Sequence, residues 1–356
     1  MNESTSKPES AAATPTPMSN PDSHAIQHDG SGIVHTDDAV ALGSRFFGWA
    51  TLIVFAVWFV NRVLIITFGW PGAGAVASGG GALSAIQLVS YGAALAFSAW
   101  LVLRDKTVEL RADAARVHEF NLFVVRAFFF IVLFVGIGDM IVSALRVEGA
   151  LEAVFGSDLA RDLGRSQFRG PWLHVPLAVL GVICAFFFRT LGFHWLTIMI
   201  VAAELMIVIT RFVFSYEQAF MGDLVRFWYA ALFLFASAYT LYEEGHVRVD
   251  IFYAGMRNRN KGRVNSIGTV LLGMGLCWTI LIIGLGGASA VIYGSVSNFE
   301  VSQSGFGLYV KYMMAGFLGV FAITMLIQFV SYFLESVADW RDEPGTRLNR
   351  ADAAAH

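Results

Sequence analysis

Charged residues are scarce in this chain. Asp, Glu, Lys and Arg together make up only 14% of its 356 residues, whereas a soluble domain carries roughly 25%. Hydrophobic residues make up 56% of the sequence. A chain with so few charges cannot cover a water-facing surface of this size, and the composition therefore excludes an ordinary soluble protein.

Cysteine and basic residues are also too few to support two other classes of protein. The two cysteines, Cys184 and Cys277, both lie inside apolar runs, which favours packing over a disulfide or a metal pair. The net charge of −3 provides no basic face, so we expect no nucleic-acid partner. We also expect no metal and no cofactor.

Long apolar runs are abundant instead. An α-helix needs about 20 apolar residues to cross the hydrocarbon core of a bilayer. Eight runs are candidates, at roughly 46–68, 83–103, 122–145, 172–190, 193–212, 224–242, 266–296 and 307–336. A membrane β-barrel would show alternating segments of about ten residues instead. The sequence therefore predicts an all-α, polytopic transmembrane protein of about eight spans, with a break at "LGGA" (285–288) in the long seventh run.

The apolar runs divide the chain into four expected parts. Residues 1–44 are rich in Ser, Ala, Thr and Pro and contain no apolar run, which predicts a disordered tail and not a signal sequence. A turn near 189–195 separates four early spans from four late ones. We therefore expect an N-terminal membrane region of about four helices at 45–192, a four-helix core at 193–340, and a C-terminal tail at 341–356.

The distribution of basic residues predicts the orientation of the late spans. The loop at 243–265 holds five Arg or Lys residues, and the loop "SVSNFEVSQSGFG" after the next run holds none. Basic residues concentrate in cytoplasmic loops, so we place 243–265 in the cytoplasm. The loops at 104–121 and 146–171 do not indicate an orientation, because each has four basic and four acidic residues. With eight spans, both termini are expected in the cytoplasm.

Among the charged residues of the apolar runs, four are candidates for charges inside the membrane, namely Arg62, Arg126, Asp139 and Glu204. A charge at this depth is expensive and usually faces protein or a wet cavity. Asp139 or Glu204 could belong to an ion or proton path, could pair with a neighbouring helix or subunit, or, for Glu204, could stay protonated. We favour pairing, or a protonated Glu204, over an ion or proton path, because an isolated acid makes a poor relay. The two arginines lie toward the ends of their spans and can reach the interfaces.

No set of residues supports catalysis. An intramembrane serine protease needs a Ser and a His on facing helices, yet the only His after His246 is the last residue. A haem subunit needs two inward His ligands on neighbouring helices, whereas His174 and His194 lie near opposite ends of their spans. We therefore expect a protein that is not an enzyme.

The stretch "LYEEGHVRVDIF" (241–252) lies between two apolar runs and contains His246, Arg248 and Asp250. Asp250 suits the N-cap of a short interfacial helix, and the basic residues that follow suit anionic lipid headgroups. We interpret the stretch as a hairpin anchored at the membrane surface. Contact with a partner subunit is the alternative, and contact with substrate or an ion is less favoured.

Three stretches of the late half carry a family pattern. They are "RFVFSYEQAFMGDLVRFWYAALFLFASAYTLYEEGHVRVDIFY", "SNFEVSQSGFGLYVKY" and "GFLGVFAITMLIQFVSYFLES". With them, residues 193–340 resemble the small membrane subunit, DctQ type, of tripartite ATP-independent periplasmic (TRAP) transporters. The pattern falls on Arg211, Asp223, Arg226, His246, Arg248, Asp250, Glu300, Ser302, Gly307, Lys311 and Gln328. The family's Trp and Glu before the second helix are replaced by "FMGD", and the first four spans are additional.

The resemblance implies a scaffold subunit in the bacterial inner membrane, surrounded by membrane lipid. Its expected partners are a large TRAP permease (DctM type) and a periplasmic substrate-binding protein (DctP type). Together they would take up an organic acid by means of an ion gradient. The resemblance gives no role to the first four spans, which we expect to be extra scaffold or lipid contact. The alternative is a structural or cofactor-anchoring subunit of an unrelated membrane complex, such as a respiratory enzyme.

Overall fold

The computed structural model describes residues 39–189, 192–216, 218–243, 253, 255–301 and 307–345. All regular secondary structure in these residues is helical. Eight of the helical segments are long and apolar enough to cross a membrane. The prediction of an all-α polytopic membrane protein with eight spans is therefore confirmed.

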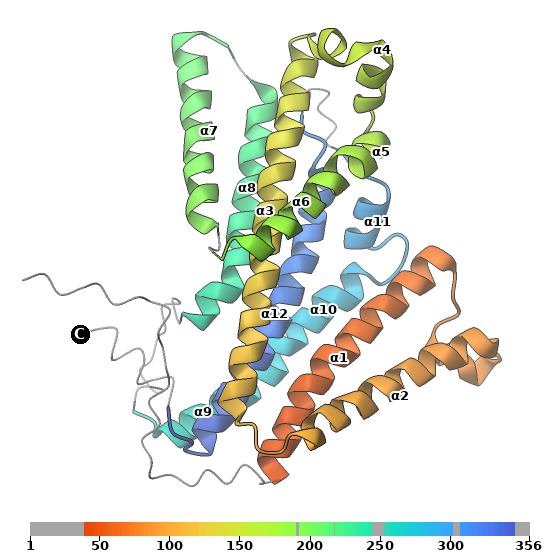
Figure 1. Ribbon diagram of the computed structural model, residues 1–356, viewed down its shortest axis with the longest axis vertical. Coiled ribbons are helices and arrows are strands. Elements are labelled where there is room, and N and C mark those ends of the chain that lie inside the picture. Colours follow the sequence, from red (N-terminus) through yellow and green to blue (C-terminus); the bar gives the residue numbers. More distant parts are fainter. Residues whose placement is uncertain are drawn as a thin grey trace, which may run out of the picture. The chain divides into compact units, whose positions relative to one another are not determined.

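The N-terminal half contributes four spans (Figure 1). The first three are single helices, and the fourth is a continuous segment made of α5, η2 and α6. The elements are α1 (Ala39–Phe68), the 3₁₀ helix η1 (Ala73–Ser78), α2 (Gly81–Arg104), α3 (Leu110–Val147), α4 (Leu151–Leu163), α5 (Ser166–Arg169), the π-helical turn η2 (Gly170–His174) and α6 (Val175–Phe187).

The C-terminal half contributes the other four spans. They are α7, α8, the continuous segment α9–η3–α10, and α12. The elements are α7 (Phe193–Val213), α8 (Ala219–Tyr242), α9 (Asn258–Gly268), the π-helical η3 (Thr269–Met274), α10 (Gly275–Gly284), α11 (Val291–Ser297) and α12 (Lys311–Trp340). The helix ends at Gly284, directly before the break predicted at 285–288.

The helices alternate in direction. In Figure 1 the start of α1, the α2–α3 connection and the end of α12 lie toward the lower end, and the α1–α2, α3–α4 and α7–α8 connections lie away from it. At a rise of 1.5 Å per residue, the 38 residues of α3 extend about 57 Å, which exceeds the hydrocarbon thickness. A helix of this length must tilt or protrude from the membrane.

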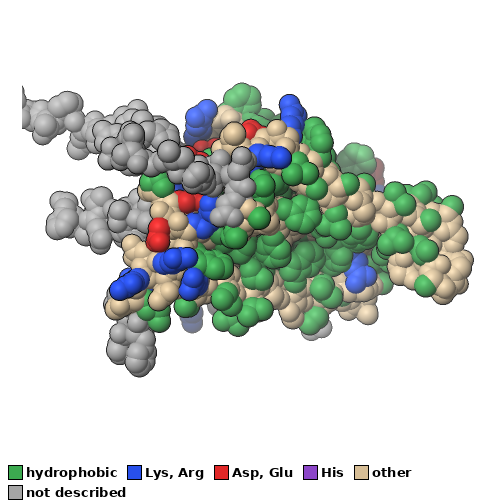
Figure 2. Space-filling model, turned by 90° about the horizontal axis from the view of Figure 1, so that it is seen from below, with side chains coloured by type: hydrophobic (Ala, Val, Ile, Leu, Met, Phe, Trp, Pro, Cys, Tyr) green, Lys and Arg blue, Asp and Glu red, His purple; other side chains and the backbone are tan. Residues whose placement is uncertain are grey.

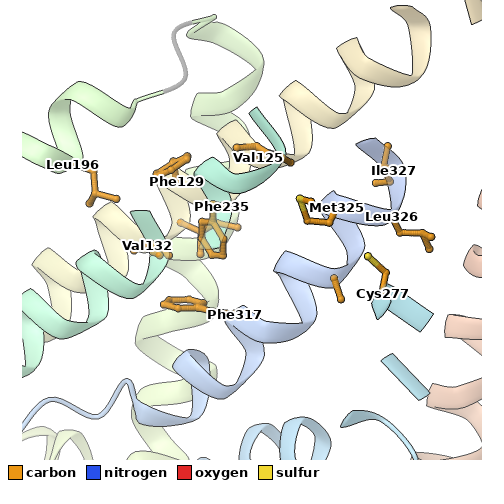
Figure 3. Packing of buried hydrophobic residues seen from close by; sticks show 14 of the residues in the cluster. Val125, Phe129, Val132, Leu196, Phe235, Cys277, Phe317, Met325, Leu326 and Ile327 are labelled. Carbon is orange, nitrogen blue, oxygen red and sulfur yellow. The ribbon is translucent and has the colours of Figure 1, made fainter. Parts of the chain in front are cut away.

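Helices α3 and α12 form the centre of the packing. Helix α12 contacts α1, α3, α8, α9, α10 and α11, and α3 contacts α6, α8 and α12. Their shared apolar cluster includes Phe235 of α8, whose ring centroid lies 5.7 Å from that of Phe129 in α3 and 5.0 Å from that of Phe317 in α12 (Figure 3). The predicted division of the chain at residue 192 stays a prediction, but α3 packs into the same core as the late helices.

Other helices expose much of their apolar surface. Helix α2 packs mainly on α1, and α7 packs mainly on α8. Their exposed side chains include Val89 and Trp100 on α2, and Trp195 and Phe212 on α7. Figure 2 shows a face whose middle is largely hydrophobic, with several Lys and Arg side chains gathered toward one end. Such a surface suits contact with lipid or with another membrane protein.

Candidate functional site

A series of hydrogen bonds runs along the contact between α3 and α12. Each joins a residue of the N-terminal half to one of the last span, in antiparallel order. They are Arg111–Asp339 (2.7 Å), Ala114 carbonyl–Ser331 (2.8 Å), His118–Gln328 (2.9 Å) and Asn121–Thr324 carbonyl (3.0 Å). Polar groups in a membrane core must find partners within protein, so these contacts fix the register of the two helices.

The carboxylate of Asp139 lies toward the opposite end of α3 from Arg111 and is fully buried. Its Oδ1 accepts a hydrogen bond from the Arg169 guanidinium at 2.8 Å and lies 3.1 Å from His174 Nε2. Its Oδ2 accepts from the backbone N–H of Tyr309 at 2.8 Å. One side chain of α3 thus binds the start of the fourth span and the segment that leads into α12.

The two partners of Asp139 make further contacts of their own. Arg169, also fully buried, donates to Ser143 Oγ at 3.0 Å and to the Leu163 carbonyl at 2.5 Å. His174 Nδ1 lies 2.7 Å from the hydroxyl of Tyr312 in α12. With the contacts of Asp139, these bonds join α3, α5, η2 and α12 in one buried network.

Local sequence explains why Arg169 and His174 converge on Asp139. Pro171 has no N–H to donate within the helix, and the backbone widens into the π-helical turn that carries His174. Gly170 packs directly against the ring of Phe299, which any larger side chain at position 170 would strike. The π-helical turn and the lack of a side chain at Gly170 are therefore both part of the local structure that carries Arg169 and His174.

Tyr309 is held between two arginines. The guanidinium carbons of Arg169 and Arg146 lie 4.2 Å and 4.6 Å from the centre of its ring. Its hydroxyl donates to the Gly164 carbonyl at 3.0 Å and accepts from Arg146, which also donates to the Gly307 carbonyl at 3.0 Å. Cation–π contacts between desolvated groups are worth about 2 kcal/mol, so these contacts stabilise the position of this segment.

The buried network is suited to holding helices together. A buried ion pair is most stable when its remaining polar groups are also satisfied. Three groups surround the Asp139 carboxylate, whereas Nη2 of Arg169 has no hydrogen-bond partner among the described residues. Among the described residues, no group of three or more His, Cys, Asp or Glu side chains is placed to bind a metal ion. The arrangement provides fixed geometry between spans, and we infer no reaction from it.

Several residues of the family pattern surround the same segment. Asp223 Oδ2 accepts from the backbone N–H of Leu308 at 3.2 Å, and its other oxygen lies 3.4 Å from the exposed Arg226. Glu300 accepts from Lys311 at 2.6 Å and from Ser295 at 2.7 Å. The structure thus brings Asp223 and the Glu300–Lys311 pair to the segment that Asp139 also contacts, and Arg226 lies beside Asp223.

The remaining sequence-predicted residues lie elsewhere. Arg211 is exposed in the last turn of α7. Arg62 lies 5.7 Å from the ring centre of Trp58, Arg126 is half-buried on α3, and Glu204 is exposed on α7. The hairpin residues and one Ser lie outside the described part of the chain, namely His246, Arg248, Asp250 and Ser302.

Sequence reasoning missed the partners of Asp139. His174 was considered only as a haem ligand, and Arg169, Tyr309 and Arg146 were not considered as site residues. A signal was present in "RGPWLH" (169–174), because an Arg and a His at the start of an apolar run require a partner at that depth. The identity of that partner depends on the tertiary structure.

The Glu300–Lys311 pair predicts a measurable titration. The hydrogen bonds from Lys311 and then from Ser295 lower the pKa of Glu300 below its ordinary value of 4.5. Since the folded-state pKa is depressed, the stability from this pair is present above pH 4.5 and is lost as pH falls through the lowered pKa. We expect Lys311→Met to raise the pKa of Glu300 toward its ordinary value, as measured by NMR of side-chain-labelled Glu in detergent.

A matched variant controls this titration. Ser295→Ala removes the second hydrogen bond to Glu300 and leaves Lys311 in place, so its rise in pKa should be smaller. An unchanged pKa of Glu300 in Lys311→Met would show that the pair does not form in solution.

The fold and the buried network define a polytopic helix-bundle membrane protein whose polar contacts lock its spans together. The family model of the DctQ component of tripartite ATP-independent periplasmic transporters matches residues 199–338. No curated protein and no solved structure matches the chain. Residues 199–338, less than half of the chain, are therefore similar to the DctQ-type small subunit of a TRAP transporter, which confirms the resemblance in the sequence. Four additional spans, which lie between residues 39 and 187, precede this region.

Proposed function

We propose that this protein is the scaffold subunit of a TRAP-type secondary transporter that takes up an organic acid by means of an ion gradient. Its partners in this proposal are a DctM-type large permease and a DctP-type periplasmic binding protein. The match of residues 199–338 to the DctQ component is the observation that carries the proposal. In this proposal the cargo pathway lies in the partner permease, and this chain is a stationary support.

The packing of α12 supports a stationary role. This span is the most buried of the eight and is held along its length by hydrogen bonds to α3. A support for a moving partner must resist deformation, and close packing combined with hydrogen bonds between spans provides that resistance. In this proposal α3 stiffens the bundle, and α1 and α2 widen its contact with lipid.

We propose the bacterial inner membrane as the location, with both termini in the cytoplasm. The five basic residues of the loop at 243–265 and the even number of spans support this orientation. His246, Arg248 and Asp250 then anchor a hairpin at the inner surface. The outer surface, where the binding protein approaches, then includes Asp223, Arg226, Glu300 and Lys311.

Co-expression with the large permease tests the proposed function. We expect the tagged chain to co-purify with the permease in detergent, because both are subunits of one complex. In cells or proteoliposomes supplied with the binding protein, uptake of labelled organic acids should fall to background when this chain is omitted. Collapse of the ion gradient should have the same effect.

Two results would contradict the proposal. One is uptake that continues unchanged without this chain, combined with no co-purification of the permease. The other is a haem or quinone absorbance in the purified protein, which would favour the respiratory alternative. A useful control is the same uptake assay with a permease of unrelated fold, which should not depend on this chain.

A further inference from the structure

Helix α7 carries an acidic side chain in the middle of its span. Glu204 is the twelfth of the 21 residues of α7, about 16 Å from its start at 1.5 Å per residue. Its side chain is exposed on the surface of the helix, in contrast to the fully buried Asp139. Within the described residues, the structure gives Glu204 no hydrogen bond and no ion pair.

Two faces of α7 differ in what covers them. Leu196, Ile200 and Ala203 are buried and lie on the face that packs against α8. A second stripe, displaced around the helix, is exposed along the whole span. It consists of Thr197, Val201, Glu204, Val208 and Arg211, and we call it the α7 outer stripe.

The spacing of the α7 outer stripe is that of a helix-packing surface. Its residues follow one another at intervals of four and three positions. Residues with this spacing lie along one side of a helix and can pack against a second helix. In Figure 1, α7 lies at one edge of the helices that are drawn, next to α8. All five side chains of the α7 outer stripe are exposed, so no helix of the described part of the chain covers this seam.

An exposed carboxyl group at this depth selects what can cover it. Acyl chains of lipid offer no hydrogen-bond donor, and a polar group in the hydrocarbon core is costly without one. A water-soluble binding protein at the membrane surface does not reach this depth. A second copy of this chain would place two glutamates together, which disfavours their ionised forms. A transmembrane helix of another protein, with a cationic or donating side chain, satisfies the group.

We propose that the α7 outer stripe is the docking surface for a transmembrane helix of the large permease, which places a cationic or hydrogen-bond-donating side chain against Glu204. This inference rests on the proposed function. Arg211 adds a second point of recognition, about 10 Å along the helix from Glu204 and near its outer end. The partner helix therefore presents an acidic or accepting group at the outer level and a donor at mid-depth.

Photo-crosslinking in membranes that contain both subunits tests the surface directly. A photoreactive amino acid is placed at Val208, on the stripe, and in a separate variant at Val89 on α2. Val89 is 68% exposed and belongs to a span whose exposed face is apolar, so it is a control for unspecific contact. We expect a cross-link to the large permease from Val208 and none from Val89.

Substitution of Glu204 tests the role of the carboxyl group. We expect Glu204→Leu to reduce the co-purified permease roughly five- to tenfold, as for loss of an interhelical hydrogen bond in a membrane. Glu204→Gln, which keeps an acceptor, should lose less. Met206→Leu alters an exposed residue on the opposite side of α7 and should leave co-purification unchanged. Size-exclusion profiles of all three variants report whether the chain still folds.

The outcomes separate this inference from the proposed function. Wild-type co-purification without a cross-link from Val208, or with unchanged recovery of permease for Glu204→Leu, overturns the docking surface alone. A cross-link from Val208 to a second copy of this chain, or only to lipid, also overturns it. Failure of the wild-type chain to co-purify at all overturns both proposals.

Discussion

Replacement of Asp139 by Ala is expected to destabilise the protein by about 3–5 kcal/mol, the usual cost of removing one partner from a buried ion pair. The substitution leaves the guanidinium of Arg169 fully buried with no opposing charge. It also removes the acceptor of the Tyr309 backbone N–H and the contact with His174. Denaturation in detergent, followed by tryptophan fluorescence, measures the loss.

Two variants serve as controls for this prediction. Asp158→Ala breaks the exposed pair of Asp158 with Arg161 on α4 and should cost no more than about 1 kcal/mol, since exposed pairs contribute little. The double variant Asp139→Leu/Arg169→Met removes both charges and should recover much of the stability. A loss in Asp139→Ala no larger than that in Asp158→Ala would show that the buried network does not stabilise the fold.

Hydropathy predicted the spans well because length and apolarity are local properties of the sequence. The run at 193–212 corresponds to α7 at Phe193–Val213, and the break at 285–288 follows directly after the end of α10 at Gly284. The ends of α3 were predicted less well. Its first turns, which begin at Leu110, contain charged and polar residues that hydropathy excludes from a span. They are helical because α12 and α1 provide partners.

The polar contacts illustrate what the sequence does not reveal by itself. Asp113 of α3 is buried and accepts from Arg45 at 2.7 Å and from the Trp49 indole at 3.1 Å, both on α1. These residues lie more than 60 positions apart in the sequence. A single sequence shows that each charge requires a partner and does not show which helix supplies it. The same holds for Asp139 and Arg169.

The family pattern identified the segment before α12 and left its support unexplained. Glu300, Gly307 and Lys311 belong to that pattern, and they lie in or beside the segment that contains Tyr309. Asp139, Arg146 and Arg169 hold this segment from the additional spans, which the pattern does not cover. A resemblance limited to four helices therefore cannot predict a contact made by the other four.

We therefore expect the additional spans and the family region to depend on each other for folding. Truncation measures that dependence. We expect residues 193–356 expressed alone to give no folded protein. Without α3, the polar side chains of Gln328 and Ser331 on α12 would face lipid, and α12 and α8 would lose an apolar partner along much of their length. A chain that begins at residue 106 retains α3 and should fold, with lower stability because the partner of Asp113 on α1 is gone.

Both truncations keep an even number of the eight spans, so the direction of membrane insertion does not distinguish them. Fluorescence-detected size exclusion of fusion proteins provides the measurement. We expect a sharp peak for the chain that begins at residue 106, and aggregation or degradation for residues 193–356. Co-expression of residues 1–192 should restore the sharp peak, because α3 then returns as a separate fragment. A sharp peak from residues 193–356 alone would contradict the dependence, since α8 and α12 would then pack without α3.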